Sequence, residues 1–169
     1  EFEVIVVCDG PKDKTLEILI DTFALIPTLD VSRLKLSHKP IKESYISSID
    51  KKLKVVLKEN GGKADALNCG INISVYPLFC AIDADCILDS EALHKLAQPF
   101  FLDNNTVASG GIVRIANGCE IINGNVKKVD KTKTWLETIQ IVEYLRAYSN
   151  GRMGWFALDS VMIISGAFG

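Results

Sequence analysis

Apolar and polar positions alternate along the chain with two periods, one typical of strands and the other of helices. Continuous or β-branched apolar runs predict strands at Phe2–Cys8, Leu34–Ser37, Lys54–Leu57 and Leu78–Ile82. Apolar residues at helical spacing predict helices over Lys14–Ile26, over the stretch that follows Gly62 and reaches about Ser74, over Ser90–Leu102 and over Thr134–Ser149. Pro40–Lys52 is ambiguous, and we interpret it as a loop with some helix.

The last third of the chain has β-rich segments separated by turn signals. Thr106–Ile115 is apolar and β-rich, and Ala116-Asn117-Gly118 predicts a hairpin turn into Cys119–Ile122. Asn123-Gly124-Asn125 is a second turn of the same kind, and a final strand is expected at Val161–Ile164. Strands that alternate with helices predict a single α/β domain over residues 1–169, with a mostly parallel central sheet flanked by helices.

Composition narrows the class of protein. Apolar residues make up 48% of the 169 positions, enough for one domain with a sizeable core. A formal net charge of −2 argues against non-specific nucleic-acid binding, which needs excess Lys and Arg. The five cysteines show no C-x-x-C spacing, so we interpret them as reduced thiols rather than a disulfide framework or a zinc site. No signal peptide and no apolar run near the ~20 residues of a membrane span is seen.

Two surface features keep alternative interpretations open. The basic cluster Lys127–Lys133 is either a solvated loop or a segment that faces an anionic membrane surface. The predicted helix Thr134–Ser149 has more apolar and aromatic residues than a narrow stripe holds. This surplus indicates a core contact on two sides or an exposed face for a membrane or partner.

Two acidic residues follow the apolar run Leu78–Ile82. If the chain stays extended there, Asp83 and Asp85 lie on the same side of the strand, about 7 Å apart. Open α/β sheets bind ligands beyond the carboxyl ends of their strands, and carboxylates suit Mg²⁺ or Mn²⁺ together with substrate phosphates. The two acids are therefore either a metal–phosphate site or a solvated turn before the next helix.

A glycine-rich turn opens the helix that reaches Ser74. Backbone amides and the helix dipole at such a place can hold an anion. The turn is not a P-loop, because Leu57 occupies the first glycine position and Ala64 the position of the metal-binding Ser or Thr. Lys63 is accordingly an anion-binding residue or an ordinary surface lysine.

Taken together, these stretches resemble the family 2 glycosyltransferases with the GT-A fold, a Rossmann-like nucleotide-diphospho-sugar transferase fold. The resemblance is carried in order by four segments: VIVVCDGPKDKT (Val4–Thr15), NGGKADALN (Asn60–Asn68), DAD (Asp83–Asp85) and SGAFG (Ser165–Gly169). IVEYLRAYSNGRMGW (Ile141–Trp155) is similar to the segment before SGAFG in membrane-embedded polysaccharide synthases of the poly-N-acetylglucosamine, hyaluronan and cellulose type.

The resemblance implies a role for each motif. Asp9, with Gly10, would bind the nucleotide base, since an acceptor-only carboxylate selects the imide N–H of uracil. Lys63 would approach the base or the diphosphate. Asp83 would contact the ribose or the metal's shell, and Asp85 would ligate Mg²⁺ or Mn²⁺. The acceptor side would be lined by Ser165 and Gly166.

The implied activity is transfer of a sugar from a UDP-sugar, UDP-N-acetylglucosamine or a relative, to a glycan or lipid acceptor with inversion. A divalent cation would stabilise the departing diphosphate. The resemblance also implies a cytoplasmic domain at the inner face of the plasma membrane, with any membrane segments outside this chain. Two departures from the family pattern, Cys8 and Pro11, make the choice of nucleotide less certain than the base contact itself.

Two parts of the family pattern are not among these 169 residues. A first strand with its tyrosine–asparagine–glutamate loop would precede Glu1, and the general base would follow Gly169. We therefore expect a segment truncated at both ends that has donor-site residues and no catalytic base. The alternatives are a transferase that adds one sugar to a lipid or protein and a sugar-nucleotide-binding scaffold without transfer activity. A nucleotidyltransferase ranks below both, because its Gly-rich N-terminal phosphate loop is not seen.

Overall fold

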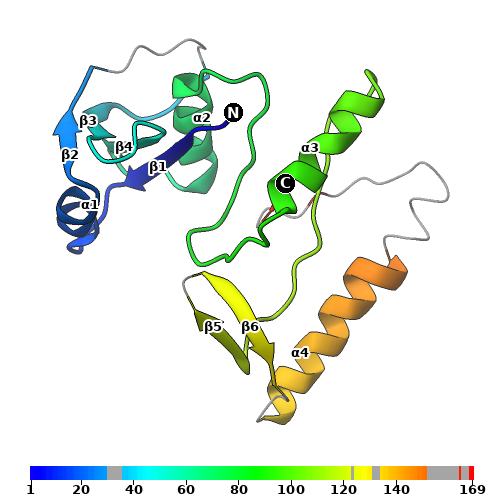
Figure 1. The fold of residues 1–169 in the computed structure, drawn as a ribbon. Coiled ribbons are helices and arrows are strands. Elements are labelled where there is room, and N and C mark those ends of the chain that lie inside the picture. The colour runs from blue at the N-terminus through cyan, green and yellow to red at the C-terminus, as the bar shows by residue number, and fades with distance from the viewer. Residues whose placement is uncertain (30–35, 123, 131–133, 152–163, 165–167) are drawn as a thin grey trace. The chain divides into compact units, whose positions relative to one another are not determined.

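The computed structural model describes residues 1–29, 36–122, 124–130, 134–151, 164 and 168–169. It divides the chain into two compact units, Glu1–Phe79 and Cys80–Gly169 (Figure 1). Within the described residues, no helix has the length and apolar character needed to cross a membrane. All five cysteines are free thiols, as the sequence predicts.

The first unit is built on a four-stranded sheet. Its strands are β1 (Val4–Asp9), β2 (Leu25–Pro27), β3 (Ile41–Ser47) and β4 (Leu53–Lys58). They lie in the order β1-β4-β3-β2, with β1 and β4 parallel and the other two pairs antiparallel. The predicted strands at the start of the chain and at Lys54–Leu57 are confirmed. The sheet is mixed rather than mostly parallel, because parallel pairing is confined to β1 and β4.

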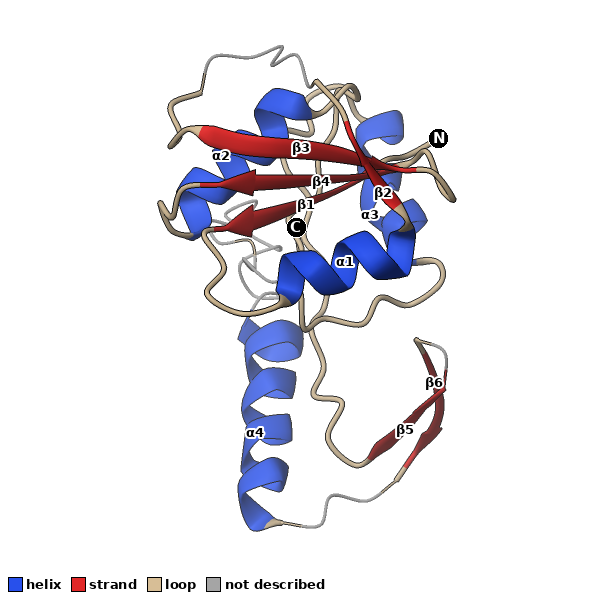
Figure 2. Cartoon of the chain, turned by 90° about the vertical axis from the view of Figure 1, so that its left-hand side faces the viewer, coloured by secondary structure: helices blue, strands red, loops and turns tan. Residues whose placement is uncertain are grey.

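A helix covers each face of this sheet (Figure 2). The first, α1 (Thr15–Phe23), packs with Leu16, Leu19 and Ile20 against a cluster that contains Cys8 and Val55. The second, α2 (Lys63–Ile73), packs with Cys69 and Ile73 against Val56 and the remaining apolar residues of β1 on the opposite face. Successive strand residues point to opposite faces, so each helix takes alternate positions of β1 and β4.

Two segments of the first unit differ from the sequence prediction. Pro40–Lys52, interpreted as a loop with some helix, contains β3. The helix predicted over Lys14–Ile26 ends at Phe23, because Ala24 adopts a left-handed φ of 45° and the chain continues as β2. Both changes follow from antiparallel pairing of β3 with β2 and β4. The strand predicted at Leu34–Ser37 lies partly outside the described residues, and its last two residues are not in a strand.

The described part of the second unit has two α-helices, a hairpin and a π-helical turn. Its elements are α3 (Ala92–Leu102), β5 (Cys119–Ile122), β6 (Asn125–Val129), α4 (Trp135–Leu145) and a π-helical turn, Arg146–Gly151. A capping box starts α4, since the Thr134 hydroxyl accepts from the Glu137 N–H and the Glu137 carboxylate accepts from the Thr134 N–H. Much of α4 is exposed in this unit, with 79% of Trp135 accessible.

Strand predictions in this unit are only partly confirmed. The hairpin forms at the second predicted turn, between β5 and β6, and Thr106–Ile115 is not a strand. The predicted central strand Leu78–Ile82 is also wrong within the described residues, where its ladder pairing is a single antiparallel bridge from Ile82 to Phe168. The strand predicted at Val161–Ile164 lies outside the described residues except for Ile164, which is not in a strand.

Candidate functional site

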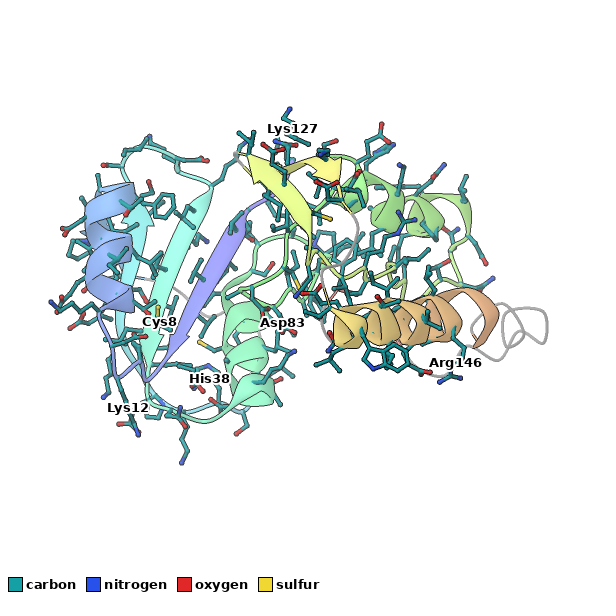
Figure 3. All side chains as sticks on the ribbon, turned by 90° about the horizontal axis from the view of Figure 1, so that it is seen from below. Cys8, Lys12, His38, Asp83, Lys127 and Arg146 are labelled. Atoms are coloured by element: carbon teal, nitrogen blue, oxygen red, sulfur yellow. The ribbon has the colours of Figure 1, made fainter. Side chains whose placement is uncertain are left out.

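The carboxyl ends of the two parallel strands carry the first part of the candidate site. Asp9 ends β1 and lies in register with Lys58, the last residue of β4. Gly10 follows with φ +60°, and its N–H donates to the carbonyl of Lys58 at 3.0 Å. A Cβ at Gly10 would stand 2.9 Å from the backbone N of Asn60, so only glycine fits here. Lys12 and His38 lie at this same end of the unit (Figure 3).

The Asp9 carboxylate is held by three donors. Its Oδ1 accepts from the Lys58 ammonium at 2.6 Å and from the Gly61 N–H at 2.9 Å. Its Oδ2 accepts from the Gly62 N–H at 2.7 Å. Partial burial alone would raise the pKa of Asp9, but the bonds from Lys58 and the two glycine amides outweigh it and lower that pKa. Asp9 is therefore an ionised, acceptor-only group that also fixes the glycine turn.

Lys58 is the charged centre of this arrangement. Its side chain has no exposed surface, and its ammonium contacts Asp9, Asp65 and the carbonyl of Glu59, the last at 2.6 Å. Burial alone would lower the pKa of Lys58, but the two carboxylates raise it, so the ammonium stays charged. The hydrogen bond from Lys58 is also the main reason that the pKa of Asp65 is lowered.

The glycine turn leads directly into α2. Gly62 has φ +87°, and Lys63 is the first helical residue, so the predicted glycine-rich turn does open a helix. The turn is tied back by Asn60, whose amide donates to the carbonyl of Asp9 at 2.9 Å, and by the Glu59 N–H, which donates to the carbonyl of Pro40. Lys63 thus starts a helix whose first-turn amides can face an anion.

One side of α2 holds the described part of the preceding loop. Asn72 accepts from the Leu36 N–H and donates to its carbonyl, and Asn68 donates to the carbonyl of Ser37. One turn closer to the helix start, Asp65 accepts from the Lys39 N–H at 2.9 Å. Residues 65, 68 and 72 recur at helical spacing, so they form one polar stripe. Asn68, the last residue of the NGGKADALN segment, therefore has a structural role, because it holds the preceding loop against α2.

The acidic motif lies in the second unit. The chain does not continue extended through Asp83–Asp85, because the Cys86 N–H donates to the carbonyl of Asp83 at 3.0 Å and closes a turn. The prediction of two carboxylates along one strand edge is therefore wrong in detail. Asp83 is half-buried and Asp85 is exposed on this turn.

The end of the chain lies beside the acidic turn. Ala81 and Gly169 exchange backbone hydrogen bonds of 2.8 and 3.4 Å, and the bridge between Ile82 and Phe168 continues this pairing. Phe168 is buried, and a Cβ on Gly111 would collide with its ring. The last two residues of the chain, Phe168 and Gly169, thus pair with the residues directly before the DAD segment. The predicted acceptor-side residues Ser165 and Gly166 lie outside the described residues.

The predicted site residues fall into two groups. Asp9, Gly10 and Lys63 are gathered at one end of the first unit, and Asp83 and Asp85 share a turn of the second. Within the described residues, no three His, Cys, Asp or Glu side chains are grouped to hold a metal ion. The two acids alone would thus leave most coordination positions to substrate and water.

Comparison with known proteins decides the family. The model of glycosyl transferase family 2 matches residues 1–148. The chain belongs to this family. The matched part of this family 2 chain includes both groups of site residues, from Asp9 to Asp85, and ends before the SGAFG segment.

Two curated relatives of this family 2 chain carry the same name. The poly-beta-1,6-N-acetyl-D-glucosamine synthase of Staphylococcus aureus (strain COL) is 30% identical over 128 residues, which cover 76% of this chain and 25% of the relative. The synthase of the same name from Staphylococcus epidermidis is 30% identical over 130 residues, covering 77% and 26%. The chain therefore spans about a quarter of the length of the curated relatives it matches. Among solved structures, none gives a significant match.

Sequence reasoning missed Lys58 and Asp65. Lys58 resembles the ordinary solvated lysine that commonly ends a strand, and Asp65 occupies an unremarked position in the glycine-turn motif. The alternation of residues along β1 and β4 could have pointed to Lys58. If β1 and β4 are parallel and in register at their apolar cores, Asp9 and Lys58 become cross-strand neighbours of opposite charge.

Proposed function

We propose that this chain is the donor-binding part of a glycosyl transferase catalytic domain that uses a UDP-sugar. The supporting observation is the carboxylate of Asp9 at the carboxyl end of β1. Among the residues that the structure describes, three donors occupy three of its roughly four acceptor positions, and the position that these leave is on Oδ2. This carboxylate can accept one further N–H, as the uracil imide would provide. Ligands of α/β sheets bind at such strand ends.

The other residues of the first unit suit the phosphates. Lys63 stands at the first position of α2, where its charge and the helix dipole both favour an anion. Gly10 lets the glycine turn lie close behind Asp9, because a Cβ at Gly10 would stand 2.9 Å from the backbone N of Asn60. In this proposal Asp9 and Gly10 bind the base, and Lys63 binds the base edge or the diphosphate.

Mg²⁺ or Mn²⁺ belongs to the same proposal. Hard cations of this kind commonly take one or two protein carboxylates, and complete their shell with phosphate oxygens and water. Asp85, exposed on a turn, and Asp83 beside it have the right donor atoms for that arrangement. Asp85 would hold the cation, and Asp83 its shell or the ribose. When bound, the cation would act as a Lewis acid that stabilises charge on the leaving diphosphate.

The proposed reaction is displacement at the anomeric carbon with inversion. An acceptor hydroxyl forms the new glycosidic bond, the bond from the anomeric carbon to the diphosphate breaks, and the hydroxyl proton passes to a general base. We place that base beyond Gly169 and the acceptor near Ser165 and Gly166. The relatives' printed product suggests N-acetylglucosamine as the sugar and a growing glycan as the acceptor; a lipid is the other candidate. A cytoplasmic position at the inner face of the plasma membrane, held by segments outside this chain, completes the proposal.

A turnover assay on the intact protein tests the proposal. UDP-N-acetylglucosamine and Mn²⁺ are supplied, and both released UDP and sugar incorporated into glycan are measured. We expect Asp9→Asn to lower UDP release about tenfold, because the amide loses charge and acceptor capacity. Asp13→Asn is the control: this exposed acid of the same loop bonds only locally, with Thr15, and should change UDP release less than about twofold. UDP binding without turnover would favour the scaffold alternative, and no binding would refute the proposal.

A further inference from the structure

Two lysines of β4 point to the face of the sheet that α2 covers. Lys54 and Lys58 share the strand parity of Val56, which packs against α2. Lys54 pairs with Glu3 at 3.2 Å, and Glu3 also accepts from the Val75 N–H just beyond the carboxyl end of α2. Lys58 lies at the opposite end, beside the start of that helix. Lys58 therefore contacts the start of α2 directly, and Lys54 is linked to the end of α2 through Glu3.

Lys58 differs from Lys54 in having all its donors used. An ammonium group has three N–H donors, and Lys58 contacts three acceptors: Asp9 on β1, Asp65 on α2 and the carbonyl of Glu59 in the turn. A buried ammonium is tolerated only when it is paired and hydrogen-bonded in this way. The ammonium therefore joins two strands, a turn and a helix at one point, and it cannot rotate without breaking one of these contacts.

We propose that Lys58 is the positioning residue of the donor site: it holds Asp9 as an acceptor-only carboxylate with one acceptor position left, and so restricts the site to nucleotides whose base presents a ring N–H. This inference rests on the proposed function, because it assigns the base contact to Asp9. Lys58 acts through Asp9 and does not itself touch the nucleotide.

The restriction follows from the chemistry of the bases. Uracil presents an imide N–H at ring position 3, which a carboxylate accepts. Cytosine presents a lone pair at the same ring position, and a carboxylate repels it. An aspartic acid that had taken up a proton could donate to that lone pair, so the discrimination lasts only while Asp9 stays ionised. Lys58 supplies the charge that keeps it ionised.

The electrostatic surroundings of Asp9 agree with this role. The charged groups that interact with it are Lys58 from β4 and, with opposite effect, Asp65 from α2. Partial burial favours the protonated acid, and the bonds from Lys58 and from the Gly61 and Gly62 amides reverse that preference. Without Lys58 the burial and the Asp65 charge remain, and the pKa of Asp9 rises.

The test measures binding of UDP and CDP, each with Mn²⁺, by calorimetry on the intact protein. Wild type is compared with Lys58→Met and with the matched control Lys54→Met, which removes an ion pair from the same strand face. We expect Lys58→Met to weaken UDP binding about tenfold and to reduce the UDP-over-CDP preference by a similar factor. Lys54→Met should change both by less than about twofold.

A pH series separates positioning from simple loss of structure. The ratio of wild-type to variant UDP affinity cancels the ionisation of the UDP phosphates. For Lys58→Met that ratio should increase as the pH falls from about 7.5 towards the ordinary pKa of an aspartic acid, about 3.9, because Asp9 without Lys58 takes up a proton more readily than in the wild type. For Lys54→Met it should stay constant. Equal behaviour of the two variants would overturn the inference while leaving UDP binding by the wild type intact.

A second variant decides the question if Lys58→Met does not fold. Asp65→Ala keeps Lys58 and Asp9 but removes the acceptor on α2, and so frees the ammonium from that helix. UDP affinity should then fall severalfold with no new pH dependence, and an unchanged affinity would contradict the inference. If the wild type itself binds no UDP, the proposed function fails, and this inference fails with it.

Discussion

Replacing Lys58 by methionine should weaken the first unit more than any comparable exchange on its sheet. The change keeps a side chain of similar length and apolar stem and removes only the charge and its hydrogen bonds. Two carboxylates and the carbonyl of Glu59 then lose their shared donor. The matched exchange, Lys54→Met, removes one donor from Glu3 and leaves Glu3 bonded to the amide of Val75.

The expected magnitude follows from burial. Breaking a fully buried pair costs about 3–5 kcal/mol, because one charge stays in a low-dielectric site without a partner. Here the Asp9 and Asp65 side chains keep 18% and 20% of their accessible surface, so water can reach both carboxylates after the exchange. We therefore expect a loss of about 2–3 kcal/mol for Lys58→Met. The 18% exposed Lys54 should cost about 1 kcal/mol.

Native-state hydrogen exchange of the β1 and β4 amides measures this directly, since it reports the opening free energy of this sheet within the intact protein. The pKa of Asp9 is lower in the folded state than in the unfolded state. Ionised Asp9 therefore stabilises the fold fully at a pH above its unfolded-state pKa, and this stabilisation is lost as the pH falls through its folded-state pKa. The pKa of Lys58 is raised, so its contribution is lost as pH rises beyond about 10.4. The difference between wild type and Lys58→Met should be largest between about pH 7 and about pH 9; it should shrink at lower pH, where Asp9 of the variant takes up a proton, and at higher pH, where Lys58 of the wild type loses one.

Equal opening free energies in the two lysine variants, within about 0.5 kcal/mol, would contradict the larger loss expected for Lys58→Met. The ammonium of Lys58 would then add no more than a surface ion pair, and the turn that it contacts would be held by its backbone bonds alone.

Two further changes have well-defined outcomes. Gly10→Ala places a side chain on a backbone with φ +60° and within 2.9 Å of the Asn60 backbone, so it should abolish UDP binding. Measured by hydrogen exchange, it should lower the opening free energy of the first unit by about 2–4 kcal/mol. The control is Gly124→Ala, at φ +74° with open space around it, which should lower the opening free energy of its own hairpin by only about 1 kcal/mol. Thr134→Ala removes half of the capping box with Glu137 and should destabilise the first turn of α4 by about 1 kcal/mol, which amide exchange in that turn would detect; an unchanged exchange rate would mean the box contributes nothing.

The sequence predicts those elements whose own pattern is decisive. β1 and β4 are short apolar runs, and α2, α3 and α4 have apolar residues at helical spacing with turn residues at their ends, so local pattern and fold agree. β3 is different, because IKESYIS alternates weakly and becomes a strand through pairing with β4 on one side and β2 on the other. Its identity comes from tertiary contacts, which a local pattern does not contain.

In the candidate site, too, the sequence predicts the features that depend on local pattern and not those that depend on tertiary contacts. Asp9 and the glycine turn are found from the sequence because turn residues after an apolar run indicate a strand end. The sequence left the conformation at Asp83 open between an extended strand and a turn, since an apolar run before two acids looks the same in both cases; the structure has the turn. Lys58 was missed because its burial depends on two acids that are 49 and 7 positions away in the chain. Long-range charge pairing of this kind becomes visible only with strand register in hand.

We propose that UDP binding needs a divalent cation held by Asp85. The most direct test is calorimetric titration of UDP into the intact protein with and without Mn²⁺, repeated on Asp85→Ala and on Asp103→Ala. Asp103 is the control, because its carboxylate bonds within its own turn to Asn105. We expect UDP binding to require Mn²⁺, to be lost in Asp85→Ala and to persist in Asp103→Ala. UDP binding that ignores both the metal and Asp85, or no binding by the wild type, would contradict it.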